Sequence, residues 1–385
     1  MIREEFTVRA DWREQMEALG FHFHTIDGTY WDESHAYRFT AAQIDQLDDA
    51  VNALQAMCLQ VVEHVVEQRL YDRFAIPAAL VPMVEHSWEA FKAGNAAART
   101  VIGRFDISWD GRQPPKLLEY NADTPTSLLE ASVAQWQWLQ SVRPDADQFN
   151  SIHERLIAAF KDLRSASHVQ LLHFTGCLEQ DEERGNLEYL RDCAMQAGWS
   201  THEFDIAAMG WDGAGFIDDR DQRLELAFKL YPWEWLARES FGQYLPAATT
   251  LWIEPVWKMI LSNKAVLPLL WELFPGHPNL LPAFFTQDAA LGSEWIRKPL
   301  LSREGENVIL QLNDRRIETP GPYGDEGFVY QAAAPLPRFA GPGGDAEYVC
   351  CGCWVIGGES AGMGLRVDAT PISQNTSRFS PHYFT

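Results

Sequence analysis

The segment Gly103–Glu130 restricts the possible folds of this chain more than any other. It predicts two strands joined by a polar turn, followed by a loop and the start of a helix. Arg104 and Asp106 are two residues apart on the first predicted strand, and Glu119 and Asn121 are two apart on the second. Because alternate residues of a strand share a face, each pair projects to one side of the sheet. A hairpin of these strands therefore brings the two polar pairs together.

These side chains are of the kinds that bind metal and phosphate. The oxygens of Asp, Glu and Asn are hard ligands, and Mg²⁺ binds such ligands together with substrate phosphates. The guanidinium of Arg104 is a planar fork that suits a phosphate or a developing oxyanion. The spacing alone leaves two interpretations open: a metal–phosphate site, or a solvated strand pair with alternating polar residues.

The same segment resembles a known enzyme family. The sequences RFD and LLEYNADTPTSLLE are similar to those of the glutathionylspermidine synthetase family, which is of the ATP-grasp type. The resemblance implies that Asp106, Glu119 and Asn121 bind Mg²⁺. It implies that Arg104 is the catalytic arginine, and it places Arg104, Phe105 and Asp106 at the ATP.

The C-terminal half carries further motifs of that family, so that the resemblance covers roughly residues 20–375. The sequences around Lys264 and Lys298 resemble those of the family's two ATP lysines, whose ammonium groups act as point charges on phosphates. If the resemblance is set aside, the sequence gives no reason to regard these lysines as more than ordinary surface charges. In the family, Gln331–Ala334 is the connector whose backbone meets the adenine, although a plain strand-to-loop joint is the alternative. The ATP contacts implied outside the hairpin are Lys264, Lys298, Glu304, Gly305, Gln331, Ala332, Ala333, Ala334 and Arg366.

The order of these motifs along the chain is informative. In common ATP-grasp enzymes the metal carboxylates follow the nucleotide lysines, whereas here Asp106 and Glu119 precede Lys264 and Lys298. The resemblance therefore implies a permuted ATP-grasp fold of the mixed α/β class. In such a fold the N-terminal hairpin completes a site that the C-terminal half opens.

The middle of the chain predicts a small α/β layer. HVQLLHFTG, WSTHEFDI and LELAFKL have the composition of strands, and a helix is expected over Gly185–Ala197 between the first two. No GxGxxG follows the first strand, so we exclude a NAD or FAD site. The family resemblance implies a Rossmann-like, pre-ATP-grasp layer here.

We expect three parts along the chain. Residues 1–164 hold N-terminal helices and the metal-binding hairpin, including a long helix that begins with a capping box of Thr40 and Gln43. Residues 165–255 form the pre-ATP-grasp layer. Residues 256–385 form the nucleotide-binding lid and a C-terminal hairpin that turns at Gly357–Gly362.

The composition excludes several classes of function. The formal net charge is −23, and the sequence contains no concentrated patch of basic residues. Nucleic acid is therefore not expected as a partner. This negative charge has two interpretations: it favours a cationic partner such as a polyamine, or it is the ordinary acidity of a soluble protein. We expect no membrane span and a cytoplasmic location, because no run of 18 apolar residues occurs and the N-terminus is charged. Cys350, Cys351 and Cys353 lie in a strand-like run and are expected to be buried thiols rather than a metal or redox site.

The loop after the hairpin is the candidate substrate contact. The resemblance implies that Thr124, Thr126 and Glu130 meet a peptide substrate; the alternative is ordinary N-capping of the next helix. This loop is less rich in serine than in the bifunctional family members. No amidase-type Cys–His context accompanies Cys58, so the match is to the synthetase part.

The resemblance implies a ligase that uses ATP and Mg²⁺ to join a carboxylic acid to an amine through an acyl phosphate. By analogy with the family, one option is that the acid is peptide-like, such as glutathione, and that the amine is a polyamine. The sequence leaves the identity of both substrates open. Two other functions stay open as well: a nucleotide-binding scaffold that has lost ligation, and a phosphotransferase that stops at a phosphorylated product. The intact set of hairpin residues and lysines argues against the scaffold.

Overall fold

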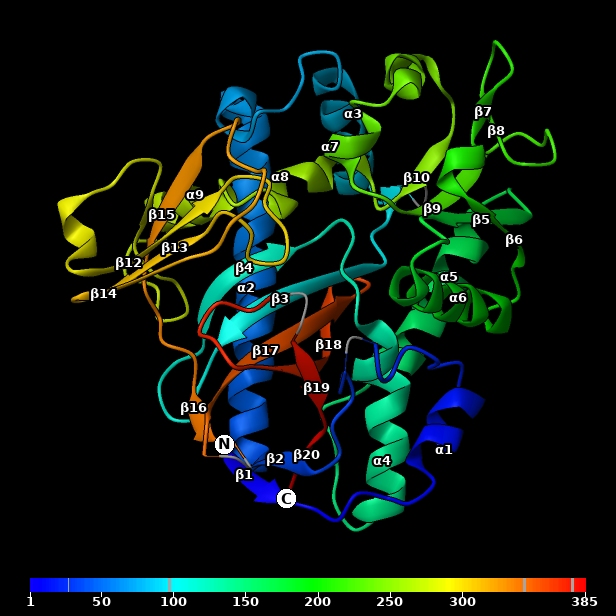
Figure 1. The fold of residues 1–385 in the computed structure, drawn as a ribbon. Helices are drawn as coiled ribbons and strands as arrows, with labels where there is room; N and C mark the ends of the chain where they lie inside the picture. Colours follow the sequence, from blue (N-terminus) through cyan, green and yellow to red (C-terminus); the bar gives the residue numbers. More distant parts are fainter. Residues whose placement is uncertain (27, 96–97, 342–343, 375–376) are drawn as a thin grey trace.

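The computed structural model describes residues 1–385 except 27, 96–97, 342–343 and 375–376. Within these residues, a central sheet lies between a sheet of β11 to β15 on one side and a parallel sheet of β5, β6, β9 and β10 on the other (Figure 1). These parts pack together through extensive apolar clusters. No helix among the described residues is long and apolar enough to cross a membrane.

The central sheet combines strands from both halves of the chain. The predicted hairpin is present as β3 (Ile102–Ser108) and β4 (Lys116–Asn121), which pair antiparallel. β3 also pairs with β17 (Ala346–Ile356), and the sheet continues through β18 (Glu359–Asp368) to β19 (Arg378–Ser380). A short strand, β16 (Arg338–Ala340), pairs with β17.

The C-terminal hairpin turns more tightly than predicted. Gly357 and Gly358 both have positive φ and form the turn, whereas Glu359 already pairs with Ile356. The expected turn over Gly357–Gly362 is therefore wrong in its second half, since those residues belong to β18.

One long helix supports the central sheet from behind. α2 (Ala41–Gln68) contacts β17 and β18 along its apolar face (Figure 1). The predicted capping box is present: the Gln43 backbone N–H donates to Thr40 Oγ1, and the Thr40 N–H donates to Gln43 Oε1. This cap satisfies two N–H groups that a helix start leaves without partners.

The remaining N-terminal elements surround this core. They are β1 (Ile2–Glu5), α1 (Trp12–Ala18), β2 (His35–Phe39), α3 (Val81–Lys92), a π-helical turn over Glu130–Ala134, α4 (Gln135–Val142) and α5 (Ile152–Ala166). β2 pairs with β1 and with the last strand, β20 (His382–Phe384). Figure 1 shows the two ends of the chain near each other as a result.

The middle segment forms the predicted α/β layer. β5 (Leu171–Gly176), β6 (Ser200–Asp205), β9 (Leu226–Leu230) and β10 (Leu251–Ile253) make a parallel sheet in the order β10-β9-β5-β6. α6 (Asp181–Gln196) connects β5 to β6. It begins before the predicted Gly185, since its first turn carries acidic side chains that favour the positive end of the helix dipole.

The lid sheet is antiparallel throughout. Its order is β11 (Ala283–Phe284), β15 (Phe328–Ala332), β12 (Glu294–Pro299), β13 (Ile309–Leu312) and β14 (Arg315–Glu318). The helices α8 (Met259–Ser262) and α9 (Val266–Leu273) precede it. Short pieces complete the chain: β7 (Gly210–Trp211), β8 (Phe216–Ile217), α7 (Trp233–Leu236) and 3₁₀ turns at Tyr71–Phe74, Ile206–Ala208, Ser240–Ala247, Val256–Lys258 and Ala289–Leu291.

The mixed α/β class is confirmed, whereas the three sequence boundaries stay a prediction. The C-terminal hairpin shares a sheet with β3 and β4, so the first and third parts are joined by main-chain hydrogen bonds. The cysteines follow the prediction: Cys350, Cys351 and Cys353 are unpaired thiols buried in β17.

Candidate functional site

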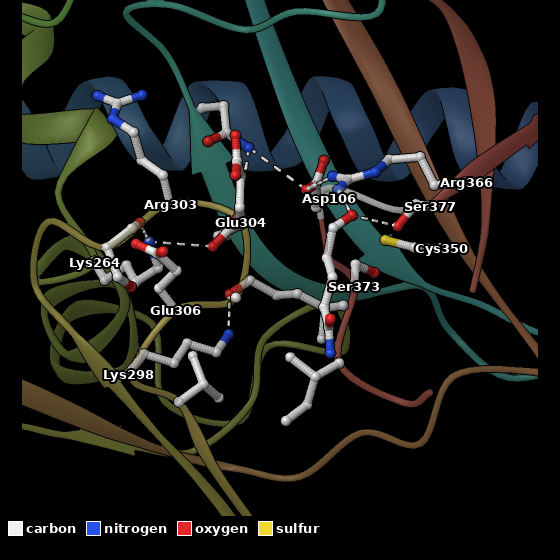
Figure 2. Close-up of a pocket in the computed structure, with 18 of the residues that line it drawn as sticks. Asp106, Lys264, Lys298, Arg303, Glu304, Glu306, Cys350, Arg366, Ser373 and Ser377 are labelled. Carbon is white, nitrogen blue, oxygen red and sulfur yellow. Dashed lines mark hydrogen bonds and ion pairs between the residues drawn. The ribbon is translucent and has the colours of Figure 1, made fainter. Parts of the chain in front are cut away.

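A cavity of about 440 Å³ opens between the central sheet, the lid sheet and the carboxyl ends of β5 and β9. Figure 2 shows side chains from these separate elements pointing into it. The lining residues include most of those predicted from the sequence: Arg104, Asp106, Glu119, Asn121, Thr124, Thr126, Lys264, Lys298, Glu304, Gly305, Gln331, Ala332, Ala333, Ala334 and Arg366.

The β3–β4 hairpin brings the two polar pairs together as predicted. In its register Arg104 is opposite Asn121 and Asp106 is opposite Glu119. The Asn121 amide nitrogen lies 3.5 Å from Asp106 Oδ2 and 3.3 Å from Glu119 Oε1. The Asp106 and Glu119 carboxylates therefore face the same amide at one end of the cavity, and two carboxylates with an amide oxygen are a donor set that suits Mg²⁺.

Phe105 lies on the opposite face of β3. Its ring is fully buried and stacks on Tyr120, with the ring centroids 3.8 Å apart. The alternation that directs Arg104 and Asp106 into the cavity directs Phe105 into the core. The Phe105 side chain therefore does not line the cavity, and a contact of Phe105 with ATP, through its backbone, stays a prediction.

Asp106 is held by two arginines from different strands. Arg104 Nε donates to Asp106 Oδ1 over 2.8 Å, and Arg366 Nη1 on β18 donates to Asp106 Oδ2 over 3.3 Å. Arg104 Nη1 also donates to the Thr126 carbonyl over 2.7 Å. Figure 2 shows Arg366 meeting Asp106 on one side of the cavity, with Lys264 and Lys298 across from them. Arg104 is thus fixed between the Asp106 carboxylate and the predicted substrate loop.

The two lysines reach the cavity from different elements. Lys264 lies just before α9; its Nζ donates to the Ser302 carbonyl over 2.5 Å and lies 3.3 Å from Glu119 Oε2. Lys298 lies on β12; its Nζ donates to the Leu118 carbonyl over 2.8 Å and to Gln331 Oε1 over 3.0 Å. Both ammonium groups are buried and adjoin Glu119, so each already has a counter-charge or carbonyl before any phosphate enters.

These neighbours shift the pKa values of the site. Burial alone would raise the pKa of Glu119, but the charges of Lys264 and Lys298 outweigh it and lower that pKa to about 2. Glu119 is therefore ionised at physiological pH and available as a ligand. Burial lowers the pKa of Lys298 to about 8, although Glu119 opposes this shift.

The far end of the cavity is apolar and lined by the predicted connector. Gln331–Ala334 lie beside Leu118, Ile296 and Leu310. Such a slot fits a flat, largely apolar ring whose edge meets main-chain groups. This end adjoins Lys298 through the bond from Lys298 Nζ to the Gln331 side chain.

The loop through Glu304 and Gly305 closes over the middle of the cavity. Both residues have positive φ, 53° and 69°. A Cβ at position 305 would lie 2.6 Å from the Ser373 carbonyl oxygen, so glycine is required both by conformation and by this close approach. The loop is therefore held against the segment that follows β18.

The predicted substrate loop lies at the other end. Thr124 and Thr126 line the cavity, whereas Glu130 is buried behind it and accepts a hydrogen bond from Tyr30 Oη over 2.6 Å. Burial, with the nearby Glu182 charge, raises the pKa of Glu130 to about 8. Tyr30 lines the cavity and Glu130 does not, so a contact of Glu130 with the substrate stays a prediction.

Several lining residues escaped prediction. Tyr30 comes from a loop with no motif, Glu182 and Glu183 come from the first turn of α6, and Trp235 comes from α7, while Arg303 donates to Thr124 Oγ1 over 3.1 Å. Glu182 and Glu183 follow β5, and Trp235 follows β9. Ligands of open parallel sheets bind at the carboxyl ends of strands, beside the point where the strand order reverses. Applied to the predicted strands, that rule could have indicated that residues following β5 and β9 line the cavity.

The charges lining the cavity are balanced. The basic side chains are Arg104, Lys264, Lys298, Arg303, Arg315 and Arg366, and the acidic ones are Asp106, Glu119, Glu182, Glu183, Glu304 and Glu306. A cavity of this kind can hold an anion such as a triphosphate and, beside it, a metal ion or a cationic amine.

Comparison with known proteins gives one family over the whole chain. The family described as "Glutathionylspermidine synthase preATP-grasp" matches residues 3–385. The chain is 40% identical to a Haemophilus influenzae protein named "Putative acid--amine ligase", and the match covers 98% of both chains.

More distant relatives are longer than this chain. It is 27% identical to the "Bifunctional glutathionylspermidine synthetase/amidase" of Escherichia coli, over 91% of this chain and 59% of that protein. It is 26% identical to the "Trypanothione synthetase" of Crithidia fasciculata, over 80% of this chain and 50% of that protein.

Among solved structures, a glutathione synthetase-like effector of Globodera pallida, in its apo form, superposes with a TM-score of 0.60. It covers 97% of this chain and 96% of its own, at 8% sequence identity. At that identity the likeness concerns the fold, and it agrees with the ATP-grasp type expected from the sequence.

Proposed function

The chain belongs to the glutathionylspermidine synthase family, and on this premise we propose that it is an ATP- and Mg²⁺-dependent ligase that forms an amide bond between a carboxylic acid and an amine. The observation that carries the proposal is the convergence of Arg104, Asp106, Glu119, Lys264 and Lys298 on one cavity, although they come from elements far apart in the chain. Chance burial of so many charges is unfavourable unless a ligand or partner compensates them.

Each end of the cavity has a role in this proposal. The apolar slot at Gln331–Ala334 takes the adenine, and Lys264 and Lys298 bind the phosphates. Asp106, Glu119 and Asn121 hold Mg²⁺, which supplies positive charge to the phosphate oxygens when it is bound. Both carboxylates face the Asn121 amide in this structure, and with the amide oxygen turned toward them the donor set would fit the ion.

The reaction has two steps. A carboxylate oxygen of the acid attacks the γ-phosphorus of ATP, the bond to the β-phosphate oxygen breaks, and ADP leaves. The nitrogen of the amine then attacks the acyl carbon of the acyl phosphate, phosphate leaves, and the nitrogen loses a proton. Arg104 and Arg366 stabilise the charge that develops on the transferring phosphoryl group and on the tetrahedral carbon.

The two organic substrates enter opposite the adenine slot. The hydroxyls of Thr124 and Thr126, with Arg303 beside them, suit a peptide-like carboxylic acid. Glu182 and Glu183 give that end a negative charge, which suits a cationic amine such as a polyamine. The names of the relatives point to the same substrate classes.

Product analysis tests the proposal. Purified protein is incubated with ATP, Mg²⁺ and pools of peptide-like acids and amines, and products are identified by mass spectrometry. We expect a new mass equal to acid plus amine minus water, with phosphate release that depends on the amine. The variant Glu119→Gln, which keeps the shape of the side chain but removes a metal ligand, serves as the negative control.

Two outcomes would contradict the ligase. ADP formation that is the same with and without amine, together with a phosphorylated acid as the product, indicates a phosphotransferase. The absence of any condensation product, with ATP binding intact, indicates a nucleotide-binding scaffold.

The pKa of Lys298 makes ATP affinity depend on pH. This pKa is lowered to about 8, so Nζ loses its proton, and with it the charge that attracts phosphate, as the pH rises through that value. We expect the ATP affinity to fall roughly tenfold between about pH 7.5 and pH 9.5. A tenfold loss is about 1.4 kcal/mol of binding free energy, the amount we assign to one lost charge contact. Calorimetry at several pH values measures it. Lys298→Arg, which stays charged throughout, should flatten the profile; equal slopes for both proteins would show that Lys298 is not responsible.

A further inference from the structure

A second cluster of polar side chains lies in the parallel sheet, on residues outside the cavity lining. His173 on β5 and His202 on β6 are direct neighbours in the parallel register, so their rings project from the same face. The hairpin loop after β8 brings Asp218 and Asp219 over that face. His202 Nε2 is 2.6 Å from Asp219 Oδ1 and 3.6 Å from Asp218 Oδ2. None of these residues lines the ligase cavity.

Asp218 is held with one oxygen free. Its Oδ1 accepts backbone N–H groups of Arg220 and Gln222 over 2.9 and 2.8 Å, which fixes the direction of the carboxylate. Its Oδ2 is buried, makes no hydrogen bond, and lies 3.3 Å from His173 Nε2. His173 is itself only 1% exposed, and neither of its ring nitrogens makes a hydrogen bond. A buried imidazole and a buried carboxylate oxygen thus face each other unsatisfied.

Unsatisfied buried polar atoms are costly and call for a missing partner. Among the described residues, Asp218 forms no ion pair with a lysine or arginine; its partners are the two histidines. Histidine nitrogens and carboxylate oxygens are both common ligands of transition metal ions.

We propose that His202, Asp218 and Asp219 bind a divalent transition metal ion of the Zn²⁺ class, with His173 as the fourth donor. One ligand atom from each of the first three already lies within 4.8 Å of the others. Two nitrogens and two carboxylate oxygens suit zinc, which takes four such ligands at about 2.0–2.2 Å. This set differs from the all-oxygen set of the hairpin, which suits Mg²⁺.

The position of the cluster indicates a structural role. β5 and β6 supply the histidines, and the loop between β8 and β9 supplies the carboxylates. An ion there ties this loop to the sheet. The Asp219 side chain is 43% exposed, which leaves a path by which the ion enters. The inference is independent of the proposed ligase reaction, because it uses none of the residues placed at the cavity.

Cobalt titration tests the site. Chelator-treated full-length protein is titrated with Co²⁺ in a large excess of Mg²⁺, which occupies all-oxygen sites, and the visible absorption of the ion is followed. We expect one Co²⁺ per chain with the spectrum of a nitrogen-containing, low-coordinate site, displaced by Zn²⁺. We also expect Zn²⁺ to raise the melting temperature of the wild type, since an ion that binds only the folded state stabilises it.

Two variants in one loop make the test specific. Asp219→Asn removes an exposed ligand with little risk to folding, and should weaken Co²⁺ binding at least tenfold and abolish the thermal shift. Asp221→Asn makes the same charge change two residues away and should bind as the wild type does; its φ of 60° is one that asparagine tolerates. No bound Co²⁺ or Zn²⁺ in excess Mg²⁺, or equal binding by Asp219→Asn and the wild type, would overturn the proposal.

Discussion

Replacing Arg104 by alanine should reduce amide formation by roughly 10²–10³-fold in kcat while most ATP affinity remains. Arg104 shares a face of β3 with Asp106 and donates to the Thr126 carbonyl of the substrate loop. The guanidinium therefore lies between the proposed metal ligand and the proposed acid. A charge so placed acts mainly where negative charge develops, in the transition state, so its loss should appear in kcat.

A structural role for Arg104 makes a different prediction. Arg104 is 7% exposed and pairs with the buried Asp106, so its removal leaves that carboxylate with Arg366 as its remaining guanidinium partner. If the pair mainly stabilises the fold, Arg104→Ala should melt far below the wild type and lose ATP affinity as well, because breaking a buried pair costs about 3–5 kcal/mol.

Three measurements on one sample separate these roles: product formation, ATP affinity and thermal melting. Arg316→Ala is the matched control, since Arg316 pairs with Glu318 on an exposed strand of the lid sheet. It should leave all three unchanged. An Arg104→Ala protein that melts normally and still forms product at the wild-type rate would refute both roles.

A second large effect is expected at a buried ion pair that anchors the substrate loop. Lys229 on β9 is fully buried; its Nζ donates to Asp123 Oδ1 over 2.6 Å and to the Tyr231 carbonyl over 3.0 Å. Asp123 Oδ2 accepts the Trp233 N–H over 2.9 Å. Because Asp123 immediately precedes Thr124, this pair fixes the start of the loop on the parallel sheet.

Lys229→Met should lower the free energy of unfolding by about 3–5 kcal/mol, since it leaves the Asp123 carboxylate buried without its counter-charge. Chemical denaturation of the variant and the wild type measures the difference. Replacing both partners, as Lys229→Met with Asp123→Leu, should recover much of the loss, apart from about 1 kcal/mol for the hydrogen bond to Trp233.

The matched control breaks an exposed pair with the same substitution. Arg184 and Glu188 pair on α6 with side chains 54% and 46% exposed. Arg184→Met should change the free energy of unfolding by no more than about 1 kcal/mol. If Lys229→Met behaves like this control, the Asp123 pair does not anchor the loop.

The hairpin shows what the sequence can predict about the site. The two-residue spacing of Arg104 with Asp106, and of Glu119 with Asn121, follows the period of a strand, so the shared face could be inferred without a structure. The same period indicates that the side chain of Phe105, which stands between two inward residues, faces the core, so that only its backbone is left for a contact with ATP. Its prediction came from resemblance alone, and resemblance does not say whether a side chain or a backbone group is used.

Contacts between segments that are far apart in the chain could not be predicted from the spacing of residues along the sequence. Nothing in the sequence near Tyr30 indicates that its hydroxyl meets Glu130, or that both lie near Glu182 at the start of α6. The cluster of His173, His202 and Asp218 was missed for the same reason. Each histidine has an ordinary place in a strand, and only the parallel register of β5 and β6 puts them side by side.

The fold was predictable where local signals are strong. The capping box at Thr40 and three of the four strands of the parallel sheet, β5, β6 and β9, were predicted because each is set by neighbouring residues, whereas the short β10 was not. The lid sheet was harder, since β11 is only Ala283–Phe284 and its pairing with β15 depends on the packing of the whole lid. Such short strands are too short to show the two-residue alternation by which a strand is recognised in a sequence.

The pairing of β3 with β17 also decides when the site can exist during synthesis. β3 and β4 leave the ribosome long before β17 and β18 have been made, and until then one edge of β3 has no partner. An open strand edge with apolar neighbours is prone to aggregate, so the nascent chain has reason to be shielded by chaperones over that interval. Arg366 is made only with β18 itself. A nucleotide at the proposed site therefore cannot use this complete set of contacts to stabilise the early half of the protein while it is being made.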